Sequence, residues 1–170
     1  MFKVNDTVVY GAQGICRISG ITTKIIKKQQ KKYYVLSPLY KENSQIFVPL
    51  DNENLTQKMN KVMSENEIKE LISSLPSEEC KWIEDDNERK TIYRKALESG
   101  DRHSVVKVIK ALYEEQQRRK AEKKKLSVSD EMILSQAENL LYDELAAVLN
   151  IKPEEVLPFI REKVNAANNA

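Results

Sequence analysis

The chain has 170 residues, of which 41% are hydrophobic and 32% charged, and its formal net charge is +2. This composition is typical of a globular protein and argues against a disordered chain. It also excludes a membrane span, because no apolar run approaches the roughly 18–20 residues that cross a bilayer. The N-terminus enters a strand pattern at once, and Cys16 and Cys80 are isolated, so we expect no signal peptide, no disulfide and a cytoplasmic protein.

The basic residues are concentrated in two regions. Residues 1–50 contain eight Lys or Arg side chains against two acidic ones, a net charge of +6, and residues 102–125 contain nine against three, again +6. Elsewhere the charges roughly cancel or are acidic. Two basic regions in a chain of near-neutral net charge favour local contacts with anionic partners over a general attraction to polyanions.

The N-terminal part of the chain has the pattern of a small β unit. Runs rich in Val, Ile and Tyr alternate with turn residues and predict strands over residues 2–10, 15–18, 21–26, 33–36 and 46–48. Gly20 is expected to be a bulge or a kink within a strand, and the polar run 27–32 a hairpin tip. Pro49 should end the last strand, because it lacks a backbone donor. Short strands at this spacing indicate a small open barrel over residues 1–58.

After Pro49 the apolar residues recur with the period of a helix. A capping box formed by Ser64 and Glu67 predicts a helix within residues 59–80, which we interpret as a linker helix. Further helices are predicted over residues 86–98, from Asp101 to the basic run 118–125, from Ser127 or Ser129 to Asn150, and from Pro153 to Val164. The sequence thus predicts an α+β chain with a helical domain over residues 81–164 and a disordered tail over residues 165–170.

The sequence carries little of the chemistry that enzymes use. His103 is the only histidine and has no nearby Cys or His partner, so a solvated surface side chain is the simpler interpretation. The four glycines form neither a Walker loop nor a dinucleotide fingerprint, and no nucleophile with a matching base is recognisable. We therefore expect no enzymatic activity, no metal, no cofactor and no small-molecule ligand.

The strongest candidate for an interaction site lies between residues 81 and 125. It begins with Trp82, the only tryptophan, which is followed by the acidic residues 84–86 and two basic helical segments. Lys and Arg bind phosphates through released counterions, and an aromatic side chain can unstack a base step. The candidate nucleic-acid contacts are Trp82, Arg89, Lys90, Arg118, Arg119, Lys123, Lys124 and Lys125. The alternative is an ordinary core tryptophan beside two solvated helix faces.

The order of several short motifs resembles one known family. Residues 2–10 (FKVNDTVVY), 14–18 (GICRI) and 46–49 (IFVP) resemble the N-terminal domain of CarD-type bacterial transcription regulators. That domain is shared with the RNA-polymerase-interacting domain of the transcription-repair coupling factor. Residues 97–101 (LESGD) and the segments 112–113, 126–127 and 137–145 agree with the second half of the family. The resemblance covers residues 1–150 and rests on the order and spacing of these motifs.

The resemblance implies a Tudor-like barrel that docks on the β subunit of RNA polymerase and a helical domain that touches promoter DNA. Lys24 matches a polymerase-contacting basic position of the family, and Phe47 occupies a second such position without the charge. Trp82 matches the tryptophan that enters the minor groove at the upstream edge of the melted bubble. The resemblance implies that the contacts with the DNA backbone and the minor groove have low sequence specificity. It also implies a regulator that stabilises the open promoter complex.

The chain departs from the family pattern near this tryptophan. The stretch between Trp82 and Ser99 is longer than in the family and contains the acidic residues 84–86. Glu131 stands at a DNA-facing basic position, and the run 118–125 supplies positive charge nearby. Two alternatives stay open: a freestanding nucleic-acid binder in which the corner at residues 99–101 forms a helix-turn-helix, and a polymerase interaction module without DNA contact.

Overall fold

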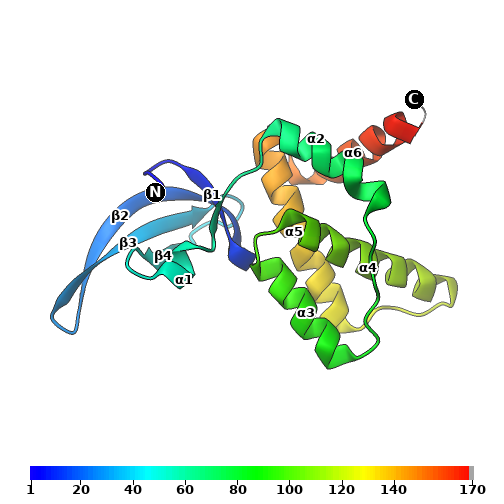
Figure 1. Cartoon of the computed structure of the whole chain (residues 1–170), viewed down its shortest axis with the longest axis horizontal. Coiled ribbons are helices and arrows are strands. Elements are labelled where there is room, and N and C mark those ends of the chain that lie inside the picture. Colours follow the sequence, from blue (N-terminus) through cyan, green and yellow to red (C-terminus); the bar gives the residue numbers. More distant parts are fainter. Residues whose placement is uncertain (169–170) are drawn as a thin grey trace. The chain divides into compact units, whose positions relative to one another are not determined.

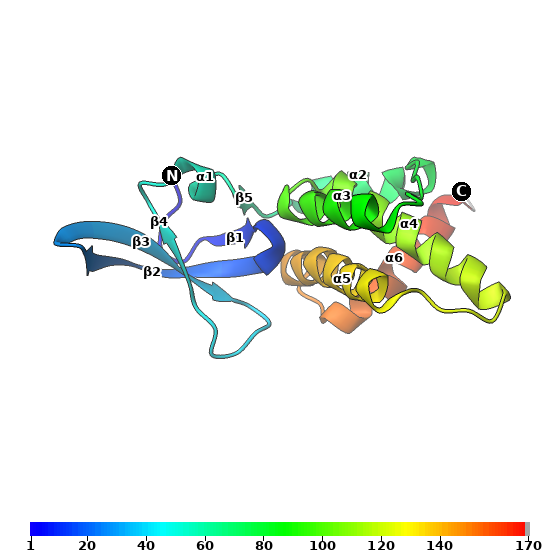
Figure 2. The same cartoon turned by 90° about the horizontal axis from the view of Figure 1, so that it is seen from below.

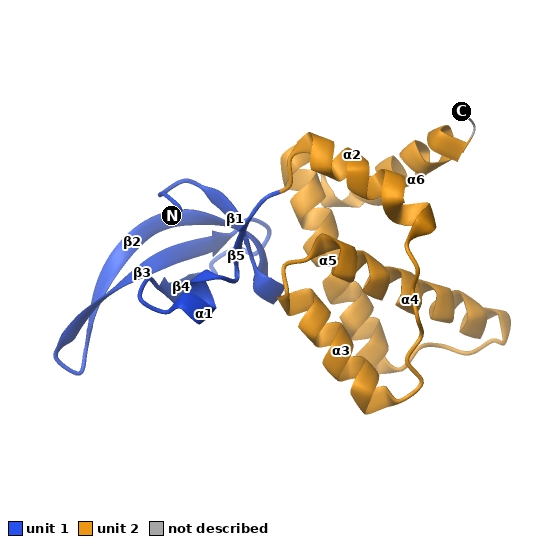
Figure 3. Ribbon diagram, in the orientation of Figure 1, with its two compact units in different colours: residues 1–62 blue, residues 63–170 orange. Residues whose placement is uncertain are grey.

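The computed structural model describes residues 1–168 and divides the chain into two compact units, residues 1–62 and residues 63–170 (Figure 3). The first unit is built around a β-sheet, and the second is helical. The predicted α+β class is therefore confirmed. Within residues 1–168, no helix combines the length and the apolar content that crossing a bilayer requires.

The β unit is a five-stranded antiparallel sheet with the strand order β4-β3-β2-β1-β5. Its strands are β1 (Thr7–Tyr10), β2 (Gly14–Ile26), β3 (Gln29–Pro38), β4 (Ile46–Pro49) and β5 (Met59–Lys61). The 3-10 turn η1 (Gly11–Gln13) joins β1 to β2, and the short helix α1 (Glu53–Thr56) precedes β5. Strands β2 and β3 form a long curved ribbon that extends beyond the shorter strands (Figures 1 and 2).

The core of the β unit follows from the period of two along its strands. The buried side chains are Val8, Cys16, Ile18, Tyr34, Leu36, Val48 and Met59. Residues that alternate with them point to the outer face of the sheet. The register between β2 and β3 shifts between Ile18 and Gly20, which confirms the bulge predicted at this glycine.

The polar run 27–32 is mostly strand rather than turn. Only Lys27 and Lys28 form the tip, with φ of 49° and 62°, and β3 already begins at Gln29. The predicted loop was therefore too long. Gln and Lys side chains are tolerated in these strands because nearly all residues of this end of the ribbon are exposed to solvent.

The helical unit contains, within the described residues, the helices α2 (Glu65–Ser74), α3 (Asp86–Glu98), α4 (Arg102–Ala121), α5 (Val128–Leu149) and α6 (Pro153–Asn168). The 3-10 turn η2 (Leu75–Ser77) follows α2. Local signals set most helix ends. Ser64 and Glu67 form the predicted capping box, Ser127 rather than Ser129 caps α5, and Asn150 ends α5 in the left-handed conformation.

Helix α5 is central to the helical unit, because it packs against α2, α3, α4 and α6. Its inner face contributes Ile133, Leu134, Ala137, Leu141 and Leu145 to the core. Glu144, on the same helix, is also buried. It accepts hydrogen bonds from the backbone N–H of Met63 at 2.8 Å and from Arg102 Nη2 at 2.7 Å. These bonds tie the residues that precede α2 and the start of α4 to α5.

Two predicted boundaries differ from the structure. Helix α2 is not a separate linker, because Ile68, Leu71 and Ile72 are buried in the helical core and the helix contacts α5 and α6. Helix α6 continues to Asn168, so the disorder predicted for residues 165–168 was wrong. The alanines in this stretch favour helix. The rest of the predicted tail, residues 169–170, lies outside the described residues.

Candidate interaction surfaces

The two predicted polymerase contacts, Lys24 and Phe47, lie together on the outer face of the β-sheet. They come from β2 and β4, which flank β3. The Nζ atom of Lys24 is 3.5 Å from the centre of the Phe47 ring and 5.7 Å from the centre of the Tyr33 ring. Lys24 is exposed, and Phe47 is 39% exposed. We call the surface formed by Lys24, Tyr33 and Phe47 the Lys24–Phe47 patch.

The strand register explains why these side chains share a face. Val35 is opposite Phe47, and Tyr33 precedes Val35 by two residues, so both aromatic rings point outward. A cation over an aromatic ring at an exposed site gains about 0.5–1 kcal/mol. Phe47 carries no charge of its own, and its ring contacts the ammonium group of Lys24.

Trp82 lies in the irregular segment between η2 and α3 and packs, half-buried, against the helical core. The guanidinium carbon of Arg89 is 4.3 Å from the centre of its ring, and that of Arg119 is 5.8 Å away. Trp82 is thus neither a fully buried core residue nor a free side chain. Trp82 is intermediate in burial, so the residue is partly accessible to solvent.

Arg89 is buried and only 2% exposed. Its Nε and Nη2 atoms donate to the two carboxylate oxygens of Asp130 at 3.0 and 2.8 Å, and Nη2 also donates to Asp86 at 2.6 Å. Its Nη1 atom donates to the backbone oxygen of Ile83 at 2.8 Å. The structure therefore corrects the predicted phosphate contact of Arg89, because a phosphate would have to displace a buried carboxylate to reach it.

Two of the acidic residues after Trp82, Asp85 and Asp86, have structural partners. The Asp85 side chain accepts a hydrogen bond from the backbone N–H of Glu88 at 2.8 Å and caps α3. Asp86 accepts a hydrogen bond from Arg89, which lowers the pKa of Asp86, and the positive charge of Lys90 adds to this effect. These contacts offset part of the repulsion that the acids would exert on a phosphate. Lys90 itself is partly buried on α3.

The basic segment 118–125 is partly neutralised where it begins. Arg118 and Arg119 both pair with the buried Glu115, and the hydrogen bond from Arg118 is the main reason why the pKa of Glu115 falls to about 2. The lysines that follow are exposed. A surface hollow of about 520 Å³ is lined by four of these lysines and by Gln116, Gln117, Leu126 and the acidic Glu131; the lysines are Lys120, Lys123, Lys124 and Lys125. The exposed positive charge of this segment therefore comes mainly from these lysines.

The chain turns at Lys123, two residues after the end of α4. The backbone N–H of Lys124 donates to the oxygen of Arg119 at 2.7 Å, and that of Lys123 donates to the oxygen of Lys120 at 3.0 Å. With φ of 57° at Lys123, these bonds form a Schellman motif in which lysine occupies the usual glycine position. Arg119 also donates to the backbone oxygen of Lys125 at 3.3 Å, so the turn lies next to the arginine that approaches Trp82.

Asp130 is the residue of this site that the sequence analysis missed. It is fully buried near the start of α5 and pairs with Arg89, which is far away in the sequence. Its backbone N–H donates to Ser127 Oγ at 3.1 Å, and the Ser127 hydroxyl donates to its carboxylate at 2.9 Å. The Ser-x-x-Asp spacing signals a helix cap. No local signal in the sequence indicates that this carboxylate also pairs with Arg89.

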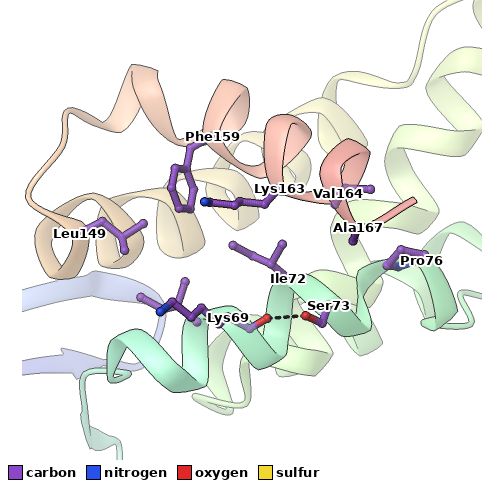
Figure 4. Close-up of a pocket in the computed structure, with 10 residues that line it drawn as sticks. Lys69, Ile72, Ser73, Pro76, Leu149, Phe159, Lys163, Val164 and Ala167 are labelled. Carbon is purple, nitrogen blue, oxygen red and sulfur yellow. Dashed lines mark hydrogen bonds between the residues drawn. The ribbon is translucent and has the colours of Figure 1, made fainter. Parts of the chain in front are cut away.

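A separate apolar pocket of about 300 Å³ lies between α2 and α6 (Figure 4). Ile68, Ile72, Leu149, Phe159 and Val164 are among its lining residues, and Lys69, Ser73 and Lys163 are its polar ones. The Ser73 hydroxyl donates to the backbone oxygen of Lys69 within α2. Such walls offer apolar packing but no recognisable catalytic set. Among residues 1–168, no three His, Cys, Asp or Glu side chains gather in a way that could hold a metal ion.

Comparison with known families gives a match for each unit. Residues 2–63 match the CarD-like/TRCF RID domain, and residues 70–161 match the C-terminal domain of CarD. Together with the fold, these matches define a transcription regulator that interacts with RNA polymerase. The chain belongs to the CarD family, which confirms the resemblance of its sequence motifs.

Proposed function

We propose that the protein binds the β subunit of RNA polymerase through the Lys24–Phe47 patch and contacts promoter DNA through Trp82 and the lysines of the basic segment. The DNA contact lies near the upstream edge of the melted bubble and stabilises the open complex, and the protein itself catalyses no reaction. A ligand that binds the open state more tightly than the closed state shifts the population toward the open state.

One observation carries the DNA part of this proposal. Trp82 and the basic segment are neighbours, because the guanidinium of Arg119 approaches the Trp82 ring and also donates to the backbone oxygen of Lys125. A partly exposed aromatic residue next to a basic segment combines the two contacts that an unstacked base step and its phosphates need. Either feature alone would be ordinary on a helical surface.

The polymerase part is supported by the chemistry of the Lys24–Phe47 patch. Aromatic side chains are enriched in protein interfaces, and a charge at the edge of an interface helps to set its association rate. The patch offers both, since Lys24 is held against two rings. The net charge of +6 over residues 1–50 adds a longer-range attraction to an acidic partner surface.

The helix-turn-helix alternative is not retained. In that alternative α4 would enter the major groove of DNA, but residues 75–80 lie along α4. Lys110 Nζ donates to the backbone oxygens of Leu75 at 2.8 Å and Glu78 at 2.6 Å, and His103 Nδ1 is 2.6 Å from the Glu78 carboxylate. Cys80 donates to Glu114 further along α4. These contacts occupy side chains that a recognition helix would need for DNA.

A polymerase-binding module without DNA contact is the second candidate. It is favoured by the pairing of Arg118 and Arg119 with Glu115, which reduces the charge offered to phosphates. The two candidates differ in what the loss of Trp82 does. A module without DNA contact would keep its effect on transcription when Trp82 is truncated, provided that the fold survives.

The test is Trp82→Ala in the full chain, measured by open-complex lifetime on one promoter and by melting temperature. Base–aromatic contacts are worth about 1–3 kcal/mol, so we expect the lifetime to fall roughly 5- to 150-fold. Polymerase binding should persist. Tyr113→Ala, which truncates an exposed aromatic residue on α4, is the matched control. A folded Trp82→Ala variant with an unchanged lifetime would contradict the DNA contact.

A further inference from the structure

We propose that Arg89 is a positioning residue that orients Trp82 before DNA arrives. This inference rests on the proposed function of Trp82 and adds how its indole is held. Asp130 fixes Arg89, and Arg89 in turn fixes both the ring of Trp82 and the backbone beside it. DNA therefore meets an aromatic side chain whose orientation is already set.

Trp82 needs such support because residues 78–84 form neither helix nor strand. Two side chains of α3 hold the backbone on either side of it. The Tyr93 hydroxyl donates to the oxygen of Lys81 at 3.3 Å, and Arg89 Nη1 donates to the oxygen of Ile83 at 2.8 Å. The position of Trp82 is thus determined by side-chain hydrogen bonds and not by regular secondary structure.

Arg89 supports the ring as well as the backbone. A guanidinium group is planar, so it can stack on an aromatic ring while the N–H groups at its edge donate hydrogen bonds. Arg89 does both, since its guanidinium carbon is 4.3 Å from the centre of the Trp82 ring and its edge binds both oxygens of Asp130. With side-chain exposures of 2% and 0%, this pair has little freedom to move.

Arg119 provides a second, weaker support. Its guanidinium carbon is 5.8 Å from the centre of the Trp82 ring, and its Nε atom donates to Glu115 at 2.9 Å. The ring is therefore bordered by two guanidinium groups, each bound to a buried carboxylate. This arrangement couples the orientation of Trp82 to α3 through one arginine and to the basic segment through the other.

A side chain that is ordered before binding avoids the loss of freedom that a mobile one suffers in the complex. Weakening the stacking of Arg89 on Trp82 should therefore shorten the open-complex lifetime, but by less than removal of the Trp82 ring does. We expect a reduction of roughly three- to tenfold for Arg89→Lys, since ordering one side chain has an effect of that size.

Because Trp82 is the only tryptophan, its fluorescence tests the positioning directly. Arg89→Lys keeps the positive charge but loses the planar group. In the full-length variant without DNA, Trp82 should be quenched more readily by acrylamide and show lower anisotropy. Arg94→Lys makes the same substitution at an exposed position of α3 and should change neither quantity. Melting temperatures report whether each variant is folded.

A milder variant keeps the test decisive if Arg89→Lys does not fold. Asp86→Asn weakens the exposed partner of Arg89 and leaves the buried pair with Asp130 in place. Its quenching should increase in the same direction as in Arg89→Lys but by less. Unchanged quenching in Asp86→Asn together with an unfolded Arg89→Lys would overturn the proposal, because Arg89 would then act on stability alone.

Open-complex lifetimes then connect the positioning to function. Arg89→Lys should shorten the lifetime in the wild-type background but have no further effect in the Trp82→Ala background. A folded Arg89→Lys variant with unchanged quenching would overturn the proposal, and so would a longer lifetime, which would make Arg89 a latch that restrains the ring. If Trp82→Ala itself has a normal lifetime, the proposed function fails, while the fluorescence still decides whether Arg89 orients Trp82.

Discussion

The ammonium group of Lys24 lies 3.5 Å from the centre of the Phe47 ring, although the strands that carry these residues do not pair with each other. Strand β3 separates β2 from β4, and the lysine side chain reaches across it. This contact limits the orientations of a long, flexible side chain. A charge that is held in place in this way can meet an acidic partner without first being ordered.

Lys24→Glu should weaken the binding of the full-length protein to the polymerase β subunit, roughly 5- to 20-fold at low salt and less at high salt, because charges at an interface rim act mainly on the association rate. The measurement is the association rate constant at two salt concentrations. Lys32→Glu is the matched control, since Lys32 is opposite Thr23 and therefore on the other face of the ribbon. Equal losses in the two variants would show that net charge matters and the patch does not.

Replacement of Lys123, Lys124 and Lys125 by glutamine should weaken DNA binding to a similar extent for all sequences. It should also flatten the dependence of log Kd on log salt by about 0.9 for each phosphate contact that is lost. The three side chains are exposed and line a surface hollow of about 520 Å³. Lys95→Gln, which removes one exposed charge from α3, is the control. An unchanged slope in the triple variant would mean that the segment is only a solvated helix end.

Lys123→Gly should separate the conformation of this turn from its charge. The left-handed backbone at Lys123 costs a residue with a side chain about 1 kcal/mol relative to glycine. The variant should therefore unfold at a higher temperature, by roughly 4–8 °C, while losing at most one phosphate contact. Trp82 fluorescence reports the melting of the helical unit.

The control for this substitution is Lys124→Gly, because Lys124 is the next residue and does not have a positive φ. Glycine there removes the same charge without relieving strain, so that variant should be no more stable than the wild type. Stabilisation of both variants would point to charge repulsion within the segment rather than to the Schellman motif.

The features that could be predicted from the sequence are local. The capping box of Ser64 and Glu67, the bulge next to Gly20 and the helix stop at Asn150 each depend on residues within one turn or one strand. Hydrophobic periodicity then distinguished the strands of the first unit from the helices of the second. The order of short motifs indicated the family. None of these signals needs knowledge of which distant residues meet.

The environment of Trp82 could not be predicted in this way. Arg89 has the spacing of an exposed cation on a basic helix, and its partner Asp130 follows 41 residues later. The contact between Lys24 and Phe47 likewise depends on the order of strands in the sheet. The polar run 27–32 was misread for a related reason, since the end of a projecting ribbon has no buried face to impose an alternating pattern.

Glu115 should make the stability of the helical unit depend on pH in the acid range. Its pKa is lowered from 4.5 to about 2 in the folded protein, first because Arg118 donates a hydrogen bond to it and further because Arg119 does so. A carboxyl group whose pKa is lower in the folded state stabilises the fold fully above its unfolded pKa. That contribution is lost as the pH falls from about 4.5 toward 2, and it amounts to roughly 1–3 kcal/mol.

Glu115→Gln removes this titration, so the variant should be less stable than the wild type near neutral pH, and the difference should shrink as the pH falls. The measurement is the free energy of unfolding in urea, followed by Trp82 fluorescence between about pH 6 and about pH 3. Glu70→Gln, at an exposed position of α2, is the control and should show a small difference that does not change with pH. If the two variants behave alike, Glu115 titrates as a surface carboxylate does, and its ion pairs with Arg118 and Arg119 do not stabilise the end of α4.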